Sequence, residues 1–154
     1  MKRLVVLAAI AVSGNAFAGV WNEIPDAGEL VPSAQHTVGL GDLNLINGRL
    51  SSNNDTDMFC IKIVDAAKFS ATVAKTLMDD GVGIDSQLFL FDMNGNGIAH
   101  NDDEVLANQT NSVLPVGDAA YANLAPGKYL LAINLWDADP TDGTNAIFAD
   151  QAQS

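Results

Sequence analysis

The sequence has one cysteine and few basic residues, and these two shortages narrow the class of protein. Cys60 has no second cysteine to pair with, so no disulfide framework supports the fold. A lone thiol inside an apolar run is typically a small buried hydrophobe, and we expect that role here. The chain carries 7 Lys and Arg against 19 Asp and Glu. Because such a surface repels phosphate, we expect no nucleic-acid partner.

The sequence also lacks an apolar run of the roughly 20 residues that a membrane-spanning helix needs. Its N-terminus instead carries Lys2 and Arg3, then an apolar stretch over 4–12, then the small-x-small pattern Ala16-Phe17-Ala18. This order predicts a signal peptide that ends at Ala18 and a mature start at Gly19. The mature chain then spans 19–154, and losing Lys2 and Arg3 makes its net charge −14 (5 basic less 19 acidic). We expect it in the periplasm or secreted outside the cell, without a membrane span.

Glutamate is scarce: sixteen of the acidic residues are Asp and three are Glu. Asp, with Asn and Gly, is typical of turns and calcium loops rather than of helix surfaces. Alternating or dense apolar runs bounded by such residues predict five strands: Leu43–Leu50, Met58–Val64, Phe69–Lys75, Gln87–Phe91 and Tyr129–Trp136. A helix over Ala67–Leu77 is the alternative for the third run, but no cap favours it.

The last two runs are almost continuously apolar, which indicates central strands buried on both faces. With no convincing amphipathic helix between them, the runs predict a single all-β sandwich domain over residues 19–154. Residues 19–40 are expected to be an extended lead-in and 137–154 an irregular tail.

The most specific local motif is the stretch 92–103. Oxygen-bearing side chains stand at positions 1, 3 and 5, Gly at 6, and a carboxylate at 12; the candidate ligands are Asp92, Asn94, Asn96, Asp102 and Asp103. That spacing is typical of a calcium loop. Two departures exclude a simple EF-hand: position 12 is Asp instead of Glu, and the loop follows a strand. A plain hairpin turn is the alternative, because Asn-Gly is a strong turn signal.

Two further groups of aspartates are weaker candidates. Asp55 and Asp57 lie two residues apart at the start of a strand, so their side chains project to the same side. Carboxylates so close repel each other unless a cation lies between them, although a solvated turn is the alternative. Asp137, Asp139 and Asp142 form a third acidic turn, which we expect to be solvated.

Catalytic motifs are scarce. The two histidines lack a Gly-x-Ser-x-Gly nucleophile, a His-Glu-x-x-His zinc pair and a phosphate-binding glycine loop. A pair of aspartates could act on a glycoside, but nothing selects one pair among so many acids. We therefore predict that the chain is not an enzyme.

Four short motifs, taken in order, resemble the bacterial pre-peptidase C-terminal (PPC) domains of secreted proteins that often end in a PEP-CTERM sorting tail. They are Glu23-x-x-Asp26, Asp55-x-Asp57-x-Phe59-x-Ile61, Gln87-Leu-Phe-Leu-Phe-Asp92 followed by Asn94-Gly95 and Asp102-Asp103, and Leu124-x-Pro126-Gly127-x-Tyr129. The resemblance covers Trp21 to Trp136. The sorting tail itself is absent here.

The resemblance implies a jelly-roll-like antiparallel β-sandwich that binds other molecules without catalytic residues of its own. It implies a calcium ion shared by Glu23, Asp26, Asp55 and Asp57, and a structural tyrosine corner at Tyr129. Related chains run on through a further Gly-x-Tyr strand, so we expect either a sandwich one strand short or a truncated chain.

Together these observations predict an exported, non-catalytic, calcium-stabilised binding or surface-matrix module. The expected partner is an extracellular glycan or matrix protein. Two alternatives stay open: a purely structural acidic protein of the cell surface, and a polysaccharide hydrolase that uses an Asp pair.

Overall fold

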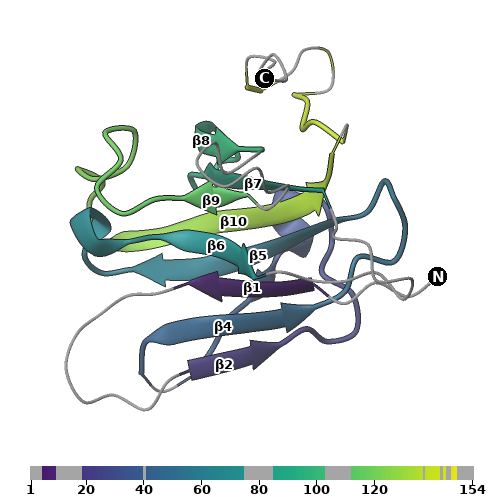
Figure 1. Ribbon diagram of the computed structural model, residues 1–154, viewed down its shortest axis with the longest axis horizontal. Helices are drawn as coiled ribbons and strands as arrows, with labels where there is room; N and C mark the ends of the chain where they lie inside the picture. The colour runs from purple at the N-terminus through teal and green to yellow at the C-terminus, as the bar shows by residue number, and fades with distance from the viewer. Residues whose placement is uncertain are drawn as a thin grey trace.

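The computed structural model describes residues 5–9, 19–39, 41–74, 85–102, 112–136, 138–142, 144 and 147–148. These residues form two five-stranded sheets and two short 3-10 helices, with no α-helix among them (Figure 1). The prediction of an all-β, sandwich-like fold is confirmed.

The first sheet has the order β2-β4-β1-β6-β9. Its strands are β2 (Gly19–Asn22), β4 (Leu43–Gly48), β1 (Val5–Ala9), β6 (Ala71–Ala74) and β9 (Val113–Leu114). β2 runs parallel to β4, and the other neighbours are antiparallel.

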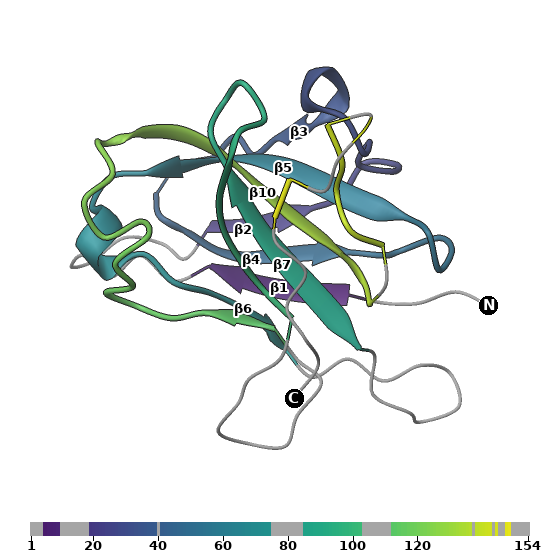
Figure 2. The same cartoon turned by 90° about the horizontal axis from the view of Figure 1, so that it is seen from above.

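The second sheet has the order β3-β5-β10-β7-β8. Its strands are β3 (Gln35–His36), β5 (Thr56–Ile63), β10 (Gly127–Leu135), β7 (Ser86–Phe91) and β8 (Gly97–Asn101). Only β3 lies parallel to its neighbour, β5. Both parallel pairs involve strands of the lead-in. The sheets are therefore mixed, whereas a wholly antiparallel sandwich was expected. The lead-in supplies one edge strand to each sheet (Figure 2).

All five predicted strands are present, with shifted ends. β5 begins at Thr56, two residues before the prediction, and β6 is shorter than predicted. Where the sequence left a helix over Ala67–Leu77 as the alternative, the one-turn 3-10 helix η2 (Ala66–Lys68) precedes the strand β6. The other 3-10 helix, η1 (Val31–Ser33), lies in the lead-in. The sequence did not reveal the lead-in strands or β8.

The main core fills the space between the two sheets. It joins Ile46 and Val73 of the first sheet to Phe59, Leu88 and Leu131 of the second. Side chains at alternate positions of the strands therefore face inward, as the alternation predicted.

A second apolar cluster covers the outer face of the second sheet. Its buried members are Ala34, Met58, Cys60, Phe89, Phe91, Leu130 and Ala132, with Val31, Ile147 and Phe148 packed against them. The lead-in and the tail thus cover this face, which confirms the prediction that β7 and β10 are buried on both sides. Cys60 is only 4% exposed, and burial raises the pKa of its thiol, so the predicted role as a buried hydrophobe is confirmed.

Two tyrosines fix the connections at one end of the sandwich. The Tyr129 hydroxyl donates a hydrogen bond to the Ala125 carbonyl at 2.7 Å, the local bond that a tyrosine corner makes. Tyr121, which the sequence did not single out, is fully buried and donates to the Pro115 carbonyl. Its ring meets that of Phe69 edge to face, with centroids 5.6 Å apart.

The predicted signal peptide contributes a strand. Residues 5–9 form β1 between β4 and β6 in the first sheet. Among the described residues, no helix has the length and apolarity that crossing a bilayer requires. Cleavage after Ala18 and export stay predictions.

Candidate metal centre

Three carboxylates converge where the lead-in passes over the ends of β4 and β5. Glu23 follows β2 directly, and its backbone N–H donates to the Asn47 carbonyl of β4 at 2.9 Å. Asp57 is the second residue of β5, on the inward-facing side that it shares with Phe59. Together with Asp26, these residues offer ligand oxygens that all lie within 4.8 Å of one another.

Backbone amides hold Glu23 in place. Its Oε1 accepts a hydrogen bond from Ala27 N and its Oε2 one from Arg49 N, both at 2.7 Å. Gly48 lies against the same carboxylate: a Cβ there would be 3.0 Å from Glu23 Oε2 and 3.6 Å from Asp57 Oδ2. The missing side chain leaves the space that the two carboxylates occupy.

Asp57 is the unusual member of the cluster. It is 1% exposed, and neither of its oxygens faces an N–H or O–H donor. Burial raises the pKa of Asp57 from 3.8 to about 9, with a further rise from the nearby charges of Glu23, Asp55 and Asp26. The Glu23 carboxylate is close enough to share a proton with it. A buried carboxylate needs either that proton or a cation.

Asp55 has a different use. It is buried, and its Oδ2 accepts a hydrogen bond from Ser51 N, which closes the turn before β5. The charge of Asp55 helps to raise the pKa of Asp57, but Asp55 does not belong to the cluster of three converging carboxylates. Of the four ligands that the resemblance implied, the structure brings three together.

The second candidate, the stretch 92–103, begins as a hairpin turn between β7 and β8. Asp92 Oδ1 accepts hydrogen bonds from Asn94 N at 2.8 Å and Asn96 N at 2.9 Å, and Oδ2 accepts one from Asn96 Nδ2 at 2.7 Å. Gly95 takes the left-handed conformation, with φ +85°, that the turn requires. These bonds lower the pKa of the half-buried Asp92 carboxyl, and the bond from the Asn96 side chain lowers it most.

The later positions of this stretch lie far from the turn. Residues 97–101 form β8, in which Gly97 pairs with Phe91 and Asn101 with Leu88. Asp102 therefore lies beyond the far end of the hairpin from Asp92, and the structure does not bring them together. Asp103 is outside the described residues.

The third acidic turn makes bonds of its own. Asp139 Oδ1 accepts from Gln87 Nε2 at 3.1 Å, and Asp142 Oδ1 accepts from Thr144 N at 2.9 Å. Asp137 lies outside the described residues.

Comparisons with protein-family models, curated proteins and solved structures found no match for the chain.

Two features of the centre were missed by sequence reasoning. Gly48 makes room for the carboxylates, but a glycine at the end of a predicted strand has no signal that separates this role from an ordinary turn. The donors to Glu23 are backbone amides, which leave no mark in side-chain sequence. In contrast, the Glu23-x-x-Asp26 motif did indicate two of the three carboxylates.

Proposed function

We propose that this chain is an exported, non-catalytic binding or surface-matrix module of the PPC-like type, stabilised by calcium at Glu23, Asp26 and Asp57. The observation that carries the proposal is Asp57, a buried carboxylate without a donor that faces two other carboxylates. The cluster contains only oxygen ligands, which favours a hard cation over zinc. Backbone carbonyls and water would supply the remaining ligands that calcium takes.

The position of the cluster gives the ion a structural role. Glu23 and Asp26 come from the lead-in, whereas Asp57 belongs to β5 of the second sheet. An ion between them ties the lead-in to the sandwich, and an ion that binds only the folded state raises its stability. Extracellular modules bind calcium weakly, so such a site fills where calcium is abundant, which agrees with the proposed export.

The use of the other aspartates supports a non-catalytic role. A glycosidase needs two carboxyl groups that face a common substrate. Asp55 and Asp92 instead accept hydrogen bonds from the backbone of their own turns. Asp55 and Asp92 are therefore better explained as turn-forming residues than as the catalytic pair of a hydrolase.

Calcium titration tests the metal part of the proposal. The protein is stripped with a chelator, and its thermal unfolding is followed by circular dichroism as calcium is added, with magnesium as the control ion. We expect the melting temperature to rise with calcium, with a stabilisation of about 2.7 kcal/mol at a concentration 100 times Kd. An unchanged melting temperature contradicts the metal site.

A binding role needs its own measurement. Extracellular glycans and matrix proteins are immobilised and exposed to the calcium-loaded protein, with the stripped protein beside it. Retention of the protein on one of these surfaces supports a binding module. Retention on none of them favours the alternative of a purely structural surface protein.

A further inference from the structure

The first sheet contains a strand position that the exported chain would lose. β1 is central: Val5 and Leu7 pair with Gly48 and Ile46 of β4, and Ala9 pairs with Ala71 of β6. All of β1 lies before Gly19. This inference therefore rests on the proposed export, because cleavage after Ala18 removes the strand.

Loss of β1 would leave two facing edges that cannot pair with each other. Neighbouring strands lie about 4.8 Å apart, so β4 and β6 are separated by roughly twice that distance. Each edge would present unpaired backbone N–H and C=O groups, which are strongly driven to find partners. On its other side, β6 pairs with the two-residue β9. The gap has the width of one strand.

The two ladders of β1 differ in length. The ladder with β6 continues to Ala9, whereas the ladder with β4 stops at the pair Leu7–Ile46. No described residue pairs with the β1 side of the stretch 43–45 of β4. In the same register, Ala8 and Ala9 lie opposite Leu45 and Asn44, so a strand one residue longer than β1 would reach Leu43.

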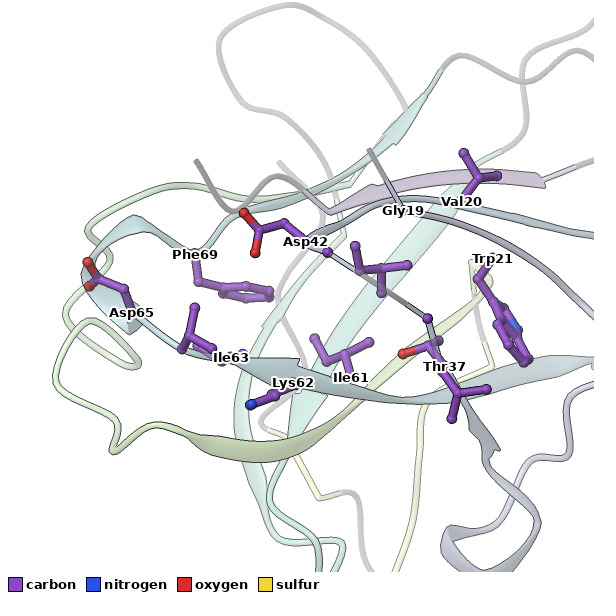
Figure 3. A pocket seen from close by; sticks show the side chains of 15 residues that line it. Gly19, Val20, Trp21, Thr37, Asp42, Ile61, Lys62, Ile63, Asp65 and Phe69 are labelled. Atoms are coloured by element: carbon purple, nitrogen blue, oxygen red, sulfur yellow. The ribbon is translucent and has the colours of Figure 1, made fainter. Parts of the chain in front are cut away.

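A pocket of about 500 Å³ includes Leu43, the residue of β4 that such a longer strand would reach. Leu43 borders it from β4 and Phe69 from the segment before β6, while Ile61 and Ile63 of β5 form its apolar floor (Figure 3). The pocket meets the gap at Leu43, and we call the two together the β1 slot.

We propose that, once the segment before Gly19 is removed, the β1 slot binds an extended apolar segment of another polypeptide, antiparallel to β4 and β6. The chain itself indicates the chemistry of the occupant, because the segment in the slot is uncharged and wholly apolar, Val-Val-Leu-Ala-Ala. The central position lies opposite Ile46 and Val73, both buried in the main core, so the occupant needs an apolar residue there. Backbone pairing supplies affinity, and the pocket supplies specificity.

The test begins with the protein as a secreting cell exports it. Its intact mass shows whether it starts at Gly19, which tests the export step separately. Synthetic peptide 2–11 is then added in saturating calcium and followed by calorimetry and hydrogen exchange. We expect binding that protects the amides of 46–48 and 71–74. The same peptide with Leu7→Pro should bind at least tenfold more weakly, because proline cannot donate to the ladder.

A second pair of proteins tests the slot even if export is wrong. The full chain, with the segment before Gly19 retained, should not bind the peptide, because its own β1 fills the slot. Its Leu7→Pro variant should bind it. Equal binding of both peptides to the exported protein, or protection elsewhere, overturns the proposal. An exported protein that binds no peptide and dimerises with these amides protected also overturns it, since a second copy then fills the slot.

Discussion

Two acidic regions of this protein stabilise their buried or half-buried carboxylates in opposite ways. At the β7–β8 turn, the Asp92 carboxylate accepts hydrogen bonds from Asn94 and Asn96 of its own loop, and its pKa is lowered. At the lead-in, Asp57 is buried without a donor beside Glu23, and its pKa is raised. The Asp92 carboxylate has its hydrogen-bond donors within its own loop. The Asp57 carboxylate has none, so it is buried only with a bound proton or with a cation beside it.

This difference shows that regular spacing in sequence is a poor guide to where oxygens converge. The stretch 92–103 has the spacing of a calcium loop but continues as a strand, so its ends separate. The lead-in cluster has no such spacing, yet β2 and β5 bring its members within 4.8 Å. The experiments below compare the two regions directly.

The largest effect is expected from Asp57→Asn. Near neutral pH, Asp57 must take up a proton to be buried, whereas Asn is neutral without one. The substitution should therefore stabilise the calcium-free protein by a few kcal/mol, on the order given by the pKa shift. The same substitution removes a proposed calcium ligand, so the rise in melting temperature with calcium should disappear. Thermal unfolding with and without calcium measures both effects.

Asp92→Asn is the matched control, because it removes the same charge from the other region. Its side-chain oxygen can still accept the turn hydrogen bonds, so the calcium response should match that of the wild type. A calcium response lost in Asp92→Asn and kept in Asp57→Asn would reverse the assignment of the two regions.

The stability of the calcium-free protein should also depend on pH through Asp57. Its pKa rises on folding from 3.8 to about 9, so between these values the folded state holds a proton that the unfolded state has released. Stability from this group is complete below pH 3.8 and is lost as the pH rises toward 9, by at most about 1.4 kcal/mol per pH unit.

Urea unfolding at several pH values in chelator checks this slope. The difference between wild type and Asp57→Asn isolates the contribution of Asp57 from the other titrating groups. His100 contributes in the opposite direction, since burial lowers its pKa, and this contribution cancels in the difference. A difference that does not vary with pH would mean that Asp57 is not buried as described.

Asp92→Ala should destabilise the protein by about 1–2 kcal/mol, because the N–H groups of Asn94 and Asn96 lose their acceptor. Both turn residues are largely solvated, which keeps the loss moderate. The loss should be the same with and without calcium, as urea unfolding can measure. A loss that appears only in calcium would place an ion at this turn.

The smallest effect is expected from Gly48→Ala. Its methyl group would press on Glu23 Oε2 at 3.0 Å, so the carboxylate must shift and calcium affinity should fall several-fold. Gly39→Ala is the control, since a Cβ there meets nothing within 4 Å. Calorimetric titration with calcium compares the two variants, and equal affinities would show that the space at Gly48 does not matter for the ion.

The sequence predicted the strands that bury side chains, because burial leaves an alternating or continuous apolar pattern. β7 and β10 are examples, and both are covered on two faces as expected. The short edge strands β2 and β3 leave no such pattern, since their existence depends on the strands β4 and β5 beside them. β8 was hidden for another reason: its five residues, Gly-Ile-Ala-His-Asn, lie inside the stretch 92–103, whose spacing indicates a loop.

The cluster of three carboxylates was predicted in part. Glu23 and Asp26 were placed by the resemblance, and Asp57 by its position at the start of a strand. The separate fates of Asp55 and Asp57 could not be predicted, because only the fold shows that Ser51 reaches Asp55 and that no donor reaches Asp57. Burial and missing partners are properties of the assembled chain.

The attachment of the lead-in to both sheets has a consequence for self-association. β2 covers the edge of β4, and β3 covers part of the edge of the eight-residue β5. Exposed strand edges are templates for pairing between molecules, and proteins protect them. If calcium fixes the lead-in, its removal loosens both edges at once. The ion then controls solubility as well as folding, and calcium-poor surroundings become the condition under which copies of this protein begin to aggregate.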